Sequence, residues 1–257
     1  MFDTGIRRRV RRLKQAWNIW GPKVKQAWFS DSREITNHTY PITKRNRTYL
    51  AWLVSHVTGR SVDEIEGYFR EIESDERAPR HVIERLSEGP WSHASDPRFD
   101  PGRRIAWYAI ARALKPDVVV ESGCERGFGA VCLIAALQRN GSGRYYGLDN
   151  NLKAGWLVSG EYAEPAKVLH GDAIETLKAF DKPIGLFVED ARHSLEFELA
   201  EYEAIRDKLA PGAVIVSDNA HVCLALERFA RKTNRRFLYM TDEPIHWQQP
   251  ASLGVAW

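Results

Sequence analysis

The chain has 257 residues, 44% of them hydrophobic and 28% charged, and a formal net charge of +3. This composition is that of a globular protein with one large domain or a domain plus an extension, and so small a charge does not by itself indicate a nucleic-acid-binding protein. The three cysteines, Cys124, Cys132 and Cys223, are odd in number and not clustered, which argues against thiol chemistry and structural zinc. Since no membrane span or signal peptide is evident, we expect a cytoplasmic protein.

Residues 1–30 are basic and contain three tryptophans. The apolar residues recur at spacings of four and three, which places them on one face of a helix that Gly21-Pro22 should end. These residues are Ile6, Val10, Leu13, Trp17 and Trp20. Such a helix can dock on its own domain or on a second subunit, which we expect. It can also lie on an anionic membrane surface, so that the protein would be peripheral to the membrane, or contact nucleic acid.

Residues 31–100 predict further helices, so that residues 1–100 form a helical N-terminal cap. Helices are expected at 46–56, at 62–73 behind a capping box that Ser61 and Glu64 provide, and at 79–86. Residues 61–88 are acidic and could pair with residues 1–30. We expect the cap to shape the substrate-binding site and to support a dimer. The turn-rich stretch 89–101, with Trp91 and His93, suits a substrate gate.

Residues 101–257 alternate short apolar runs with helical stretches, which predicts a largely parallel α/β sheet. A helix should start at Asp100-Pro101 and run to residue 114. Strands are expected at 118–121, 145–149, 166–170, 185–189, 213–217, 237–239 and 253–256. Helices are expected at 127–139, 153–162, 173–180, 195–209 and 220–232. The last two strands have only a turn between them, so we expect an antiparallel hairpin closing a seven-stranded, Rossmann-like sheet.

The first strand leads into a glycine-rich turn with the spacing Glu121-x-Gly123-x-x-x-Gly127. Gly123 allows a sharp turn off the strand, and Gly127 allows the backbone to approach a ligand closely. The free N–H groups of the helix that follows would then face that ligand. Cys124 lies inside this turn, where a small side chain is tolerated. An ordinary strand–turn–helix with incidental glycines is the alternative interpretation.

Acidic residues also end the second and third strands. Asp149, at the end of the second strand, could bind both hydroxyls of an adenosine ribose, or could cap a helix. Gly171, Asp172 and Ala173 follow the third strand. There the glycine permits close approach of an adenine, and Asp172 could accept a hydrogen bond from its amino group while also capping the next helix.

The fourth and fifth strands end in Asp190 and in Asp218-Asn219. Because these strands are neighbours in such a sheet, the three side chains should lie side by side at its edge. Two carboxylates and an amide oxygen form a set of oxygen ligands suited to Mg²⁺. The alternative is helix capping by Asp218 or Asn219 with a solvated Asp190.

Together these motifs resemble the class I S-adenosylmethionine (SAM)-dependent methyltransferases, in particular the catechol-type and macrolide-sugar O-methyltransferases. The matching residues are Glu121/Gly123/Gly127, Asp149, Gly171-Asp172-Ala173, Asp190-x-x-His193 and Asp218-Asn219. The resemblance covers about residues 104–257 and implies SAM binding by the first three groups and Asp190, and Mg²⁺ binding by Asp190, Asp218 and Asn219. Ala191-Arg192 departs from the family, which often has a glycine and an acid there, and Arg192 would bring a cation near the metal.

The resemblance implies methyl transfer to a hydroxyl of a small molecule, such as a natural product, a sugar or a glycolipid. His193 is the expected general base, because an unperturbed imidazole accepts a proton around neutrality. Packing at a helix start is its alternative role, and His221 and His246 are reserve bases. A nucleic acid or membrane lipid acceptor rests only on the basic N-terminus. The sequence after the fourth strand lacks the Pro-Pro motif of amino-group methyltransferases, and Cys223 is poorly placed for a nucleophile.

Overall fold

The computed structural model describes residues 41–90, 92, 98–245 and 250–257 of the chain. The predicted basic helix of residues 1–30 lies outside this part, as do Trp91 and His93 of the predicted gate and the reserve base His246.

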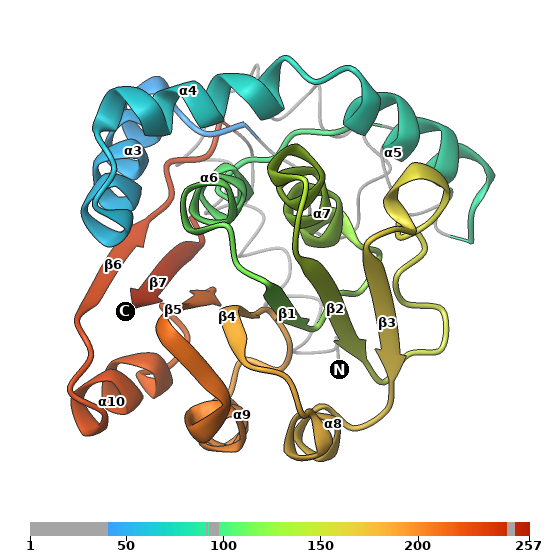
Figure 1. Ribbon diagram of the computed structural model, residues 1–257. Helices are drawn as coiled ribbons and strands as arrows, with labels where there is room; N and C mark the ends of the chain where they lie inside the picture. Colours follow the sequence, from blue (N-terminus) through green and yellow to red (C-terminus); the bar gives the residue numbers. More distant parts are fainter. Residues whose placement is uncertain (1–40, 91, 93–97, 246–249) are drawn as a thin grey trace, which may run out of the picture.

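Seven strands form one mixed sheet in the order β3-β2-β1-β4-β5-β7-β6 (Figure 1). Strands β1 to β5 are parallel, and β7 is antiparallel to both β5 and β6. The expected α/β fold with its closing hairpin is therefore confirmed. The strands are β1 (Val118–Ser122), β2 (Arg144–Asp149), β3 (Ala166–His170), β4 (Ile184–Glu189), β5 (Leu209–Asp218), β6 (Phe237–Thr241) and β7 (Ser252–Ala256).

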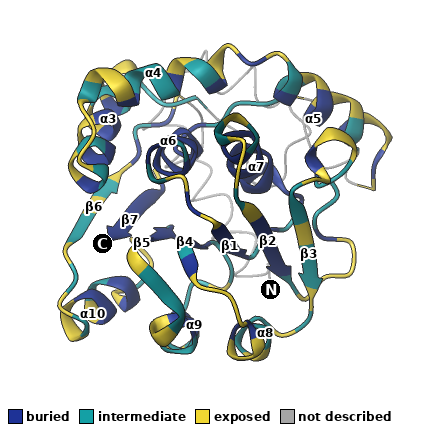
Figure 2. Ribbon diagram, viewed as in Figure 1, coloured by how far each residue is buried: buried dark blue, intermediate teal, exposed yellow. Residues whose placement is uncertain are grey.

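Helices cover both faces of the sheet, which explains why the central strands are apolar throughout rather than alternating. Every residue of β1 is buried (Figure 2). One face is covered by α6 (Arg104–Leu114) and α7 (Phe128–Asn140). The other is covered by α8 (Ala173–Ala179), α9 (Leu195–Ile205) and α10 (Ala225–Lys232). Two apolar cores result, one on each face.

Three further helices form an outer layer over α6 and α7 (Figure 1). They are α3 (Lys44–Thr58), α4 (Val62–Glu73) and α5 (Arg77–Glu88). The predicted capping box starts α4, with Ser61 Oγ accepting from Glu64 N at 3.2 Å. Apolar residues of this layer belong to the same core as those of α6 and α7. The helical extension therefore packs on the sheet domain as a continuous body.

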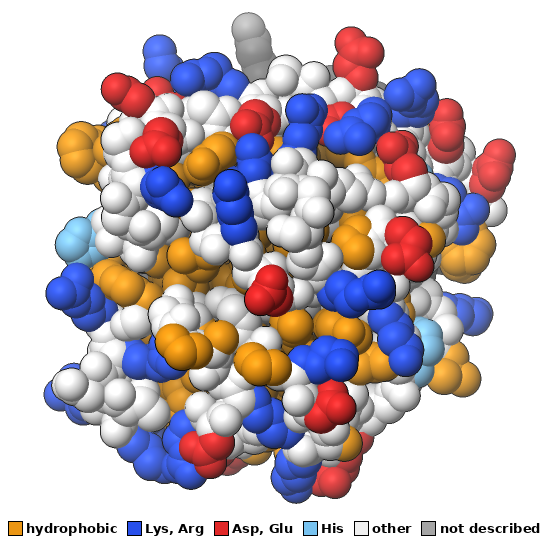
Figure 3. Space-filling model, in the orientation of Figure 1, with side chains coloured by type: hydrophobic (Ala, Val, Ile, Leu, Met, Phe, Trp, Pro, Cys, Tyr) orange, Lys and Arg blue, Asp and Glu red, His pale blue; other side chains and the backbone are white. Residues whose placement is uncertain are grey.

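Charged side chains of this outer layer are largely paired within the fold. Glu71 of α4 accepts from Arg112 of α6, and Glu73 accepts from Arg47 of α3. Basic and acidic side chains are interspersed over the face shown in Figure 3, in keeping with the small net charge. None of the described helices is long and apolar enough to cross a membrane.

Two predicted helices differ from the structure. The helix expected at 153–162 is wrong: this stretch forms turns and a short 3-10 helix, Gly160–Tyr162. Part of its backbone bonds the glycine-rich turn, since Gly155 N donates to Glu125 O and Leu157 N donates to Arg126 O, and its remaining bonds form short turns. The helix expected at 220–232 begins only at Ala225, so Cys223 precedes it rather than lying within it.

Candidate active site

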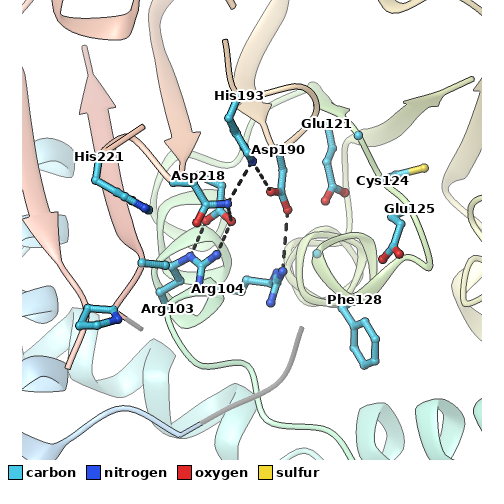
Figure 4. Close-up of a pocket in the computed structure, with 15 residues that line it drawn as sticks. Arg103, Arg104, Glu121, Cys124, Glu125, Phe128, Asp190, His193, Asp218 and His221 are labelled. Carbon is cyan, nitrogen blue, oxygen red and sulfur yellow. Dashed lines mark hydrogen bonds and ion pairs between the residues drawn. The ribbon is translucent and has the colours of Figure 1, made fainter. Parts of the chain in front are cut away.

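A cavity of about 410 Å³ opens at the carboxyl ends of β1, β4 and β5. It lies at the point where the chain order of the sheet reverses, between β1 and β4, where ligands bind in open α/β sheets. Figure 4 shows the side chains that point into it. Its described lining residues are Arg103, Arg104, Glu121, Gly123, Cys124, Glu125, Phe128, Gly129, Asp190, His193, Asp218, Asn219, His221, Pro250 and Ala251.

The glycine-rich turn needs its first glycine for two reasons. Gly123 has a φ of +83°, and a Cβ there would lie 2.2 Å from the carbonyl oxygen of Asp190. The missing side chain thus lets the ends of β1 and β4 come together. Gly127 precedes α7 with a φ of +101°, so the first N–H groups of α7 lie at the turn, as the sequence predicted.

Glu121 lies at the bottom of the cavity and is 1% exposed. Tyr145 Oη donates a hydrogen bond to its Oε2. Gly129 makes room for this carboxylate, because a Cβ at that position would lie 2.2 Å from Glu121 Oε1. Burial raises the pKa of Glu121 to about 7, even though Tyr145 and Arg104 act in the opposite direction. A cationic ligand group would restore the ionised form.

The predicted adenosine-binding acids lie at the ends of β2 and β3, next to the cavity. Asp149 Oδ2 accepts from Glu125 N at 2.9 Å and Oδ1 accepts from Asn151 N at 2.8 Å, so its carboxylate also fixes the glycine-rich turn. Gly171 N donates to Asp149 O. Asp172 caps α8, which starts at Ala173, through a 3.0 Å hydrogen bond from Glu175 N. Asp149, Gly171, Asp172 and Ala173 are not among the described residues that line the cavity itself.

The predicted metal ligands do come together, but two arginines are placed among them. Arg103 donates to both carboxylate oxygens of Asp218, with Nε 2.5 Å from Oδ1. Its Nη1 lies 3.3 Å from Asp242 Oδ2. These three side chains are at most 4% exposed. Arg104 Nη2 lies 3.7 Å from Asp190 Oδ2.

These contacts leave a poor site for a divalent ion. Burial alone would raise the pKa of Asp218, but the Arg103 guanidinium holds it below its usual value. Burial and the neighbouring Asp218 raise the pKa of Asp190 well above its usual value. Arg103 already bonds both oxygens of Asp218, and Arg104 lies beside Asp190, so this set does not fit Mg²⁺, which needs available anionic oxygen ligands.

Arg103 and Arg104 are therefore site residues that sequence reasoning missed. They stand at the start of α6, before β1, and belong to no motif; the one signal was an adjacent arginine pair at the head of a predicted helix that leads into β1. Arg192, the cation that the sequence suggested, is exposed.

His193 follows β4 and presents its two ring nitrogens to different surroundings. Nδ1 lies 3.6 Å from both Glu189 Oε2 and Glu198 Oε1, carboxylates that are at most 1% exposed. Nε2 lies 3.0 Å from Asn219 Nδ2 on the cavity side. Burial would lower the pKa of His193, but the two carboxylates outweigh it and raise the pKa to about 10.

Glu189 and Glu198, the carboxylates beside His193 Nδ1, were not predicted as site residues. The sequence of α9, which contains Glu198, has the pattern of an ordinary helix. Glu201 joins these two carboxylates, and Ser122 Oγ donates to Glu201 Oε1. The reserve base His221 lines the cavity as well, with Nδ1 2.9 Å from Ser252 Oγ. Cys124 is buried, which raises its pKa and argues against a nucleophilic role.

The sequence matches one protein-family model, and the structure is similar to several solved structures. Residues 120–220 match a family model described as a methyltransferase domain. An O-methyltransferase from Bacillus cereus, solved with S-adenosylhomocysteine (SAH), has a TM-score of 0.57 at 14% identity, covering 75% of this chain and 96% of that chain. No curated protein matches the sequence closely enough to count as a relative.

Two further solved structures share the fold. The O-methyltransferase TomG from Streptomyces achromogenes, involved in tomaymycin synthesis and solved with SAM, has a TM-score of 0.52 at 16% identity, covering 71% and 90% of the two chains. The SAH-bound methyltransferase PaMTH1 from Podospora anserina has a TM-score of 0.51 at 17% identity, covering 76% and 93%. At identities this low, these structures show that the fold is shared and nothing beyond it.

Proposed function

We propose that this chain, an enzyme with a class I SAM-dependent methyltransferase domain, transfers the methyl group of SAM to a hydroxyl oxygen of a small molecule. One observation carries the proposal: Glu121 and His193 Nε2 face the same cavity at the ends of β1 and β4. A cofactor group bound at Glu121 and an acceptor at His193 would thus meet. The O-methyltransferases among the similar structures support a hydroxyl acceptor.

SAM, when bound, supplies an electrophilic methyl group, and the residues of the chain do the rest. Glu121 binds the ammonium group of the methionine moiety as a carboxylate, and in this buried position the attraction between the two charges is strong. Asp149 binds the ribose hydroxyls while it holds Glu125 N, and Asp172 reaches the adenine from its capping position. The glycine-rich turn allows the cofactor to approach the backbone.

His193 accepts the proton of the acceptor hydroxyl at Nε2. A neutral hydroxyl is a poor nucleophile, so proton removal is the step that the protein must assist. Glu189 and Glu198 stabilise the imidazolium that forms, as the carboxylate of a catalytic triad does for its histidine. Because the Asp190, Asp218 and Asn219 set does not fit Mg²⁺, we assign no step of this reaction to a metal ion.

The acceptor can be identified by finding which compound receives a labelled methyl group from SAM. Purified enzyme is incubated with isotope-labelled SAM and a panel of phenols, sugars and glycolipids, each paired with an amine and a carboxylic acid of similar shape. Mass spectrometry then locates the label. We expect label on hydroxyl oxygen. Label on nitrogen or on a carboxyl group alone would refute the hydroxyl assignment and leave the methyltransferase assignment intact.

For the N-terminal segment we propose a role in assembly and acceptor binding. Its basic amphipathic pattern supports docking on protein, in this chain or in a second copy. Deleting residues 1–30 should then impair dimer formation or acceptor turnover more than SAH affinity, as measured by sedimentation and calorimetry. A fully active monomer would refute this role, and binding of the intact chain to anionic vesicles would favour membrane contact instead.

A further inference from the structure

The bottom of the cavity carries a cation beside the anion Glu121. Arg104, at the start of α6, lines the same cavity and is 7% exposed in its side chain. Its guanidinium carbon lies 5.3 Å from the ring centre of Trp107, and Gly129 packs between Trp107 and Glu121. The charge of Arg104 lowers the pKa of Glu121, so the two groups are close enough to interact. The cavity thus presents opposite charges at one end (Figure 4).

The other cations around the cavity stand farther along its wall, among acids of their own. Arg103 donates to both oxygens of Asp218 and also reaches Asp242. His193 has Nδ1 between Glu189 and Glu198. Among the described residues, Arg104 is a cation that lines the cavity and interacts with Glu121.

Asp190 lies beside Arg104 at this end of the cavity. The two groups are 3.7 Å apart, which is longer than a hydrogen bond. An anionic ligand group beside Arg104 would be attracted strongly, because water is largely excluded around this guanidinium.

We propose that Arg104 binds the carboxylate of the methionine moiety of SAM, while Glu121 binds its ammonium group. This inference rests on the proposed function, since it assigns a partner to the zwitterionic end of that cofactor. A guanidinium can grip a carboxylate through two parallel hydrogen bonds. The pair of opposite charges therefore selects an intact amino acid end.

The alternative partner for the carboxylate is the start of α7, whose first N–H groups also face the glycine-rich turn. The two possibilities differ in what Arg104 contributes. If α7 alone holds the carboxylate, removing the guanidinium will leave the recognition of that group unchanged.

The test compares ligands rather than rates. Calorimetry measures the affinity of the full chain for SAH, for its decarboxylated analogue and for its deaminated analogue. The proteins are the wild type, Arg104→Met, Arg104→Lys and, as a matched control, Arg192→Gln, which removes an exposed arginine from the segment that follows β4.

The wild type and Arg192→Gln should bind SAH at least about thirtyfold more tightly than the decarboxylated analogue, the loss typical of one partner in a buried charge pair. Arg104→Met should bind SAH and the decarboxylated analogue with similar affinity. That affinity should equal the affinity of the wild type for the decarboxylated analogue. Arg104→Lys should recover part of the difference. The deaminated analogue keeps the carboxylate, so the wild type should still bind it more tightly than Arg104→Met does.

Each other outcome refutes a particular claim. Equal wild-type affinity for SAH and its decarboxylated analogue means that the carboxylate is not recognised, although the proposed function stands. An undiminished preference in Arg104→Met assigns the carboxylate to α7. If Arg104→Met loses the same affinity for SAH as for the decarboxylated analogue, and Arg104→Lys does not restore it, Arg104 is a structural residue. Failure of the wild type to bind any of the three ligands refutes the proposed function itself.

Discussion

Arg103 and Asp218 form a buried, two-point ion pair that links the start of α6 to the end of β5. The guanidinium occupies the position beside Asp218 at which the sequence predicted a metal ion. Asp242, which follows β6, accepts from the same guanidinium and extends the link to the antiparallel hairpin. A fixed cation supplied by the chain thus neutralises the strand-end acids.

Removing this cation should destabilise the fold. In Arg103→Met, Asp218 and Asp242 remain buried without this guanidinium, and breaking a buried ion pair in this way typically costs about 3–5 kcal/mol. Urea denaturation measures the loss. Arg231→Met, which breaks an exposed pair with Glu227, is the control and should cost about 1 kcal/mol or less. A loss in Arg103→Met no larger than that of the control would show that the link does not stabilise the protein.

Methyl transfer should not depend on a divalent metal ion. The acids that would bind it are paired with Arg103 and Arg104. Dialysis against EDTA should leave the rate unchanged, and added Mg²⁺ should not raise it. In parallel, electron paramagnetic resonance should detect no tight Mn²⁺ binding. A rate that falls on chelation and returns with Mg²⁺ would restore the metal hypothesis that the sequence suggested.

Activity should rise with pH into the alkaline range. The general base must be neutral to accept a proton, and the pKa of His193 is raised to about 10, so the competent fraction grows as pH increases towards that value. Glu198→Gln removes one of the carboxylates that raise the pKa and should shift the profile to lower pH. His193→Ala should lower kcat about a hundredfold or more.

The control for His193→Ala is its SAH affinity, which should match that of the wild type because His193 is not expected to touch the cofactor's adenosine or methionine ends. Normal turnover by His193→Ala would move the base elsewhere, with His221 as the next candidate in the cavity wall.

Loss of the Asp149 carboxylate should weaken cofactor binding. Hydrogen bonds to a charged group contribute about 1.5–3 kcal/mol, so Asp149→Ala should bind SAH about tenfold to a hundredfold more weakly in calorimetry. Part of this loss would come through the glycine-rich turn, because Asp149 also accepts from Glu125 N. The exposed Asp181 supplies the control variant, Asp181→Ala. Equal SAH affinity in both variants would remove Asp149 from the proposed cofactor site.

The sequence by itself determined the fold and the edge of the sheet where the site lies. Apolar runs, glycines and strand-end acids are local signals, so β1 to β7 and the position of Glu121, Asp149 and Asp190 could be predicted. The helix expected at 153–162 failed because its backbone bonds the glycine-rich turn, a contact between separate segments that no local pattern records.

Only the tertiary structure decided the chemistry at that edge. Arg103 and Asp218 are far apart in the chain, and Glu198 reaches His193 only after α9 packs beside the end of β4. The sequence shows which residues carry charge. Whether two opposite charges meet, and how far water is excluded around them, depends on packing, and this decides whether Asp218 binds a metal ion or an arginine and whether His193 titrates near neutrality or well above it.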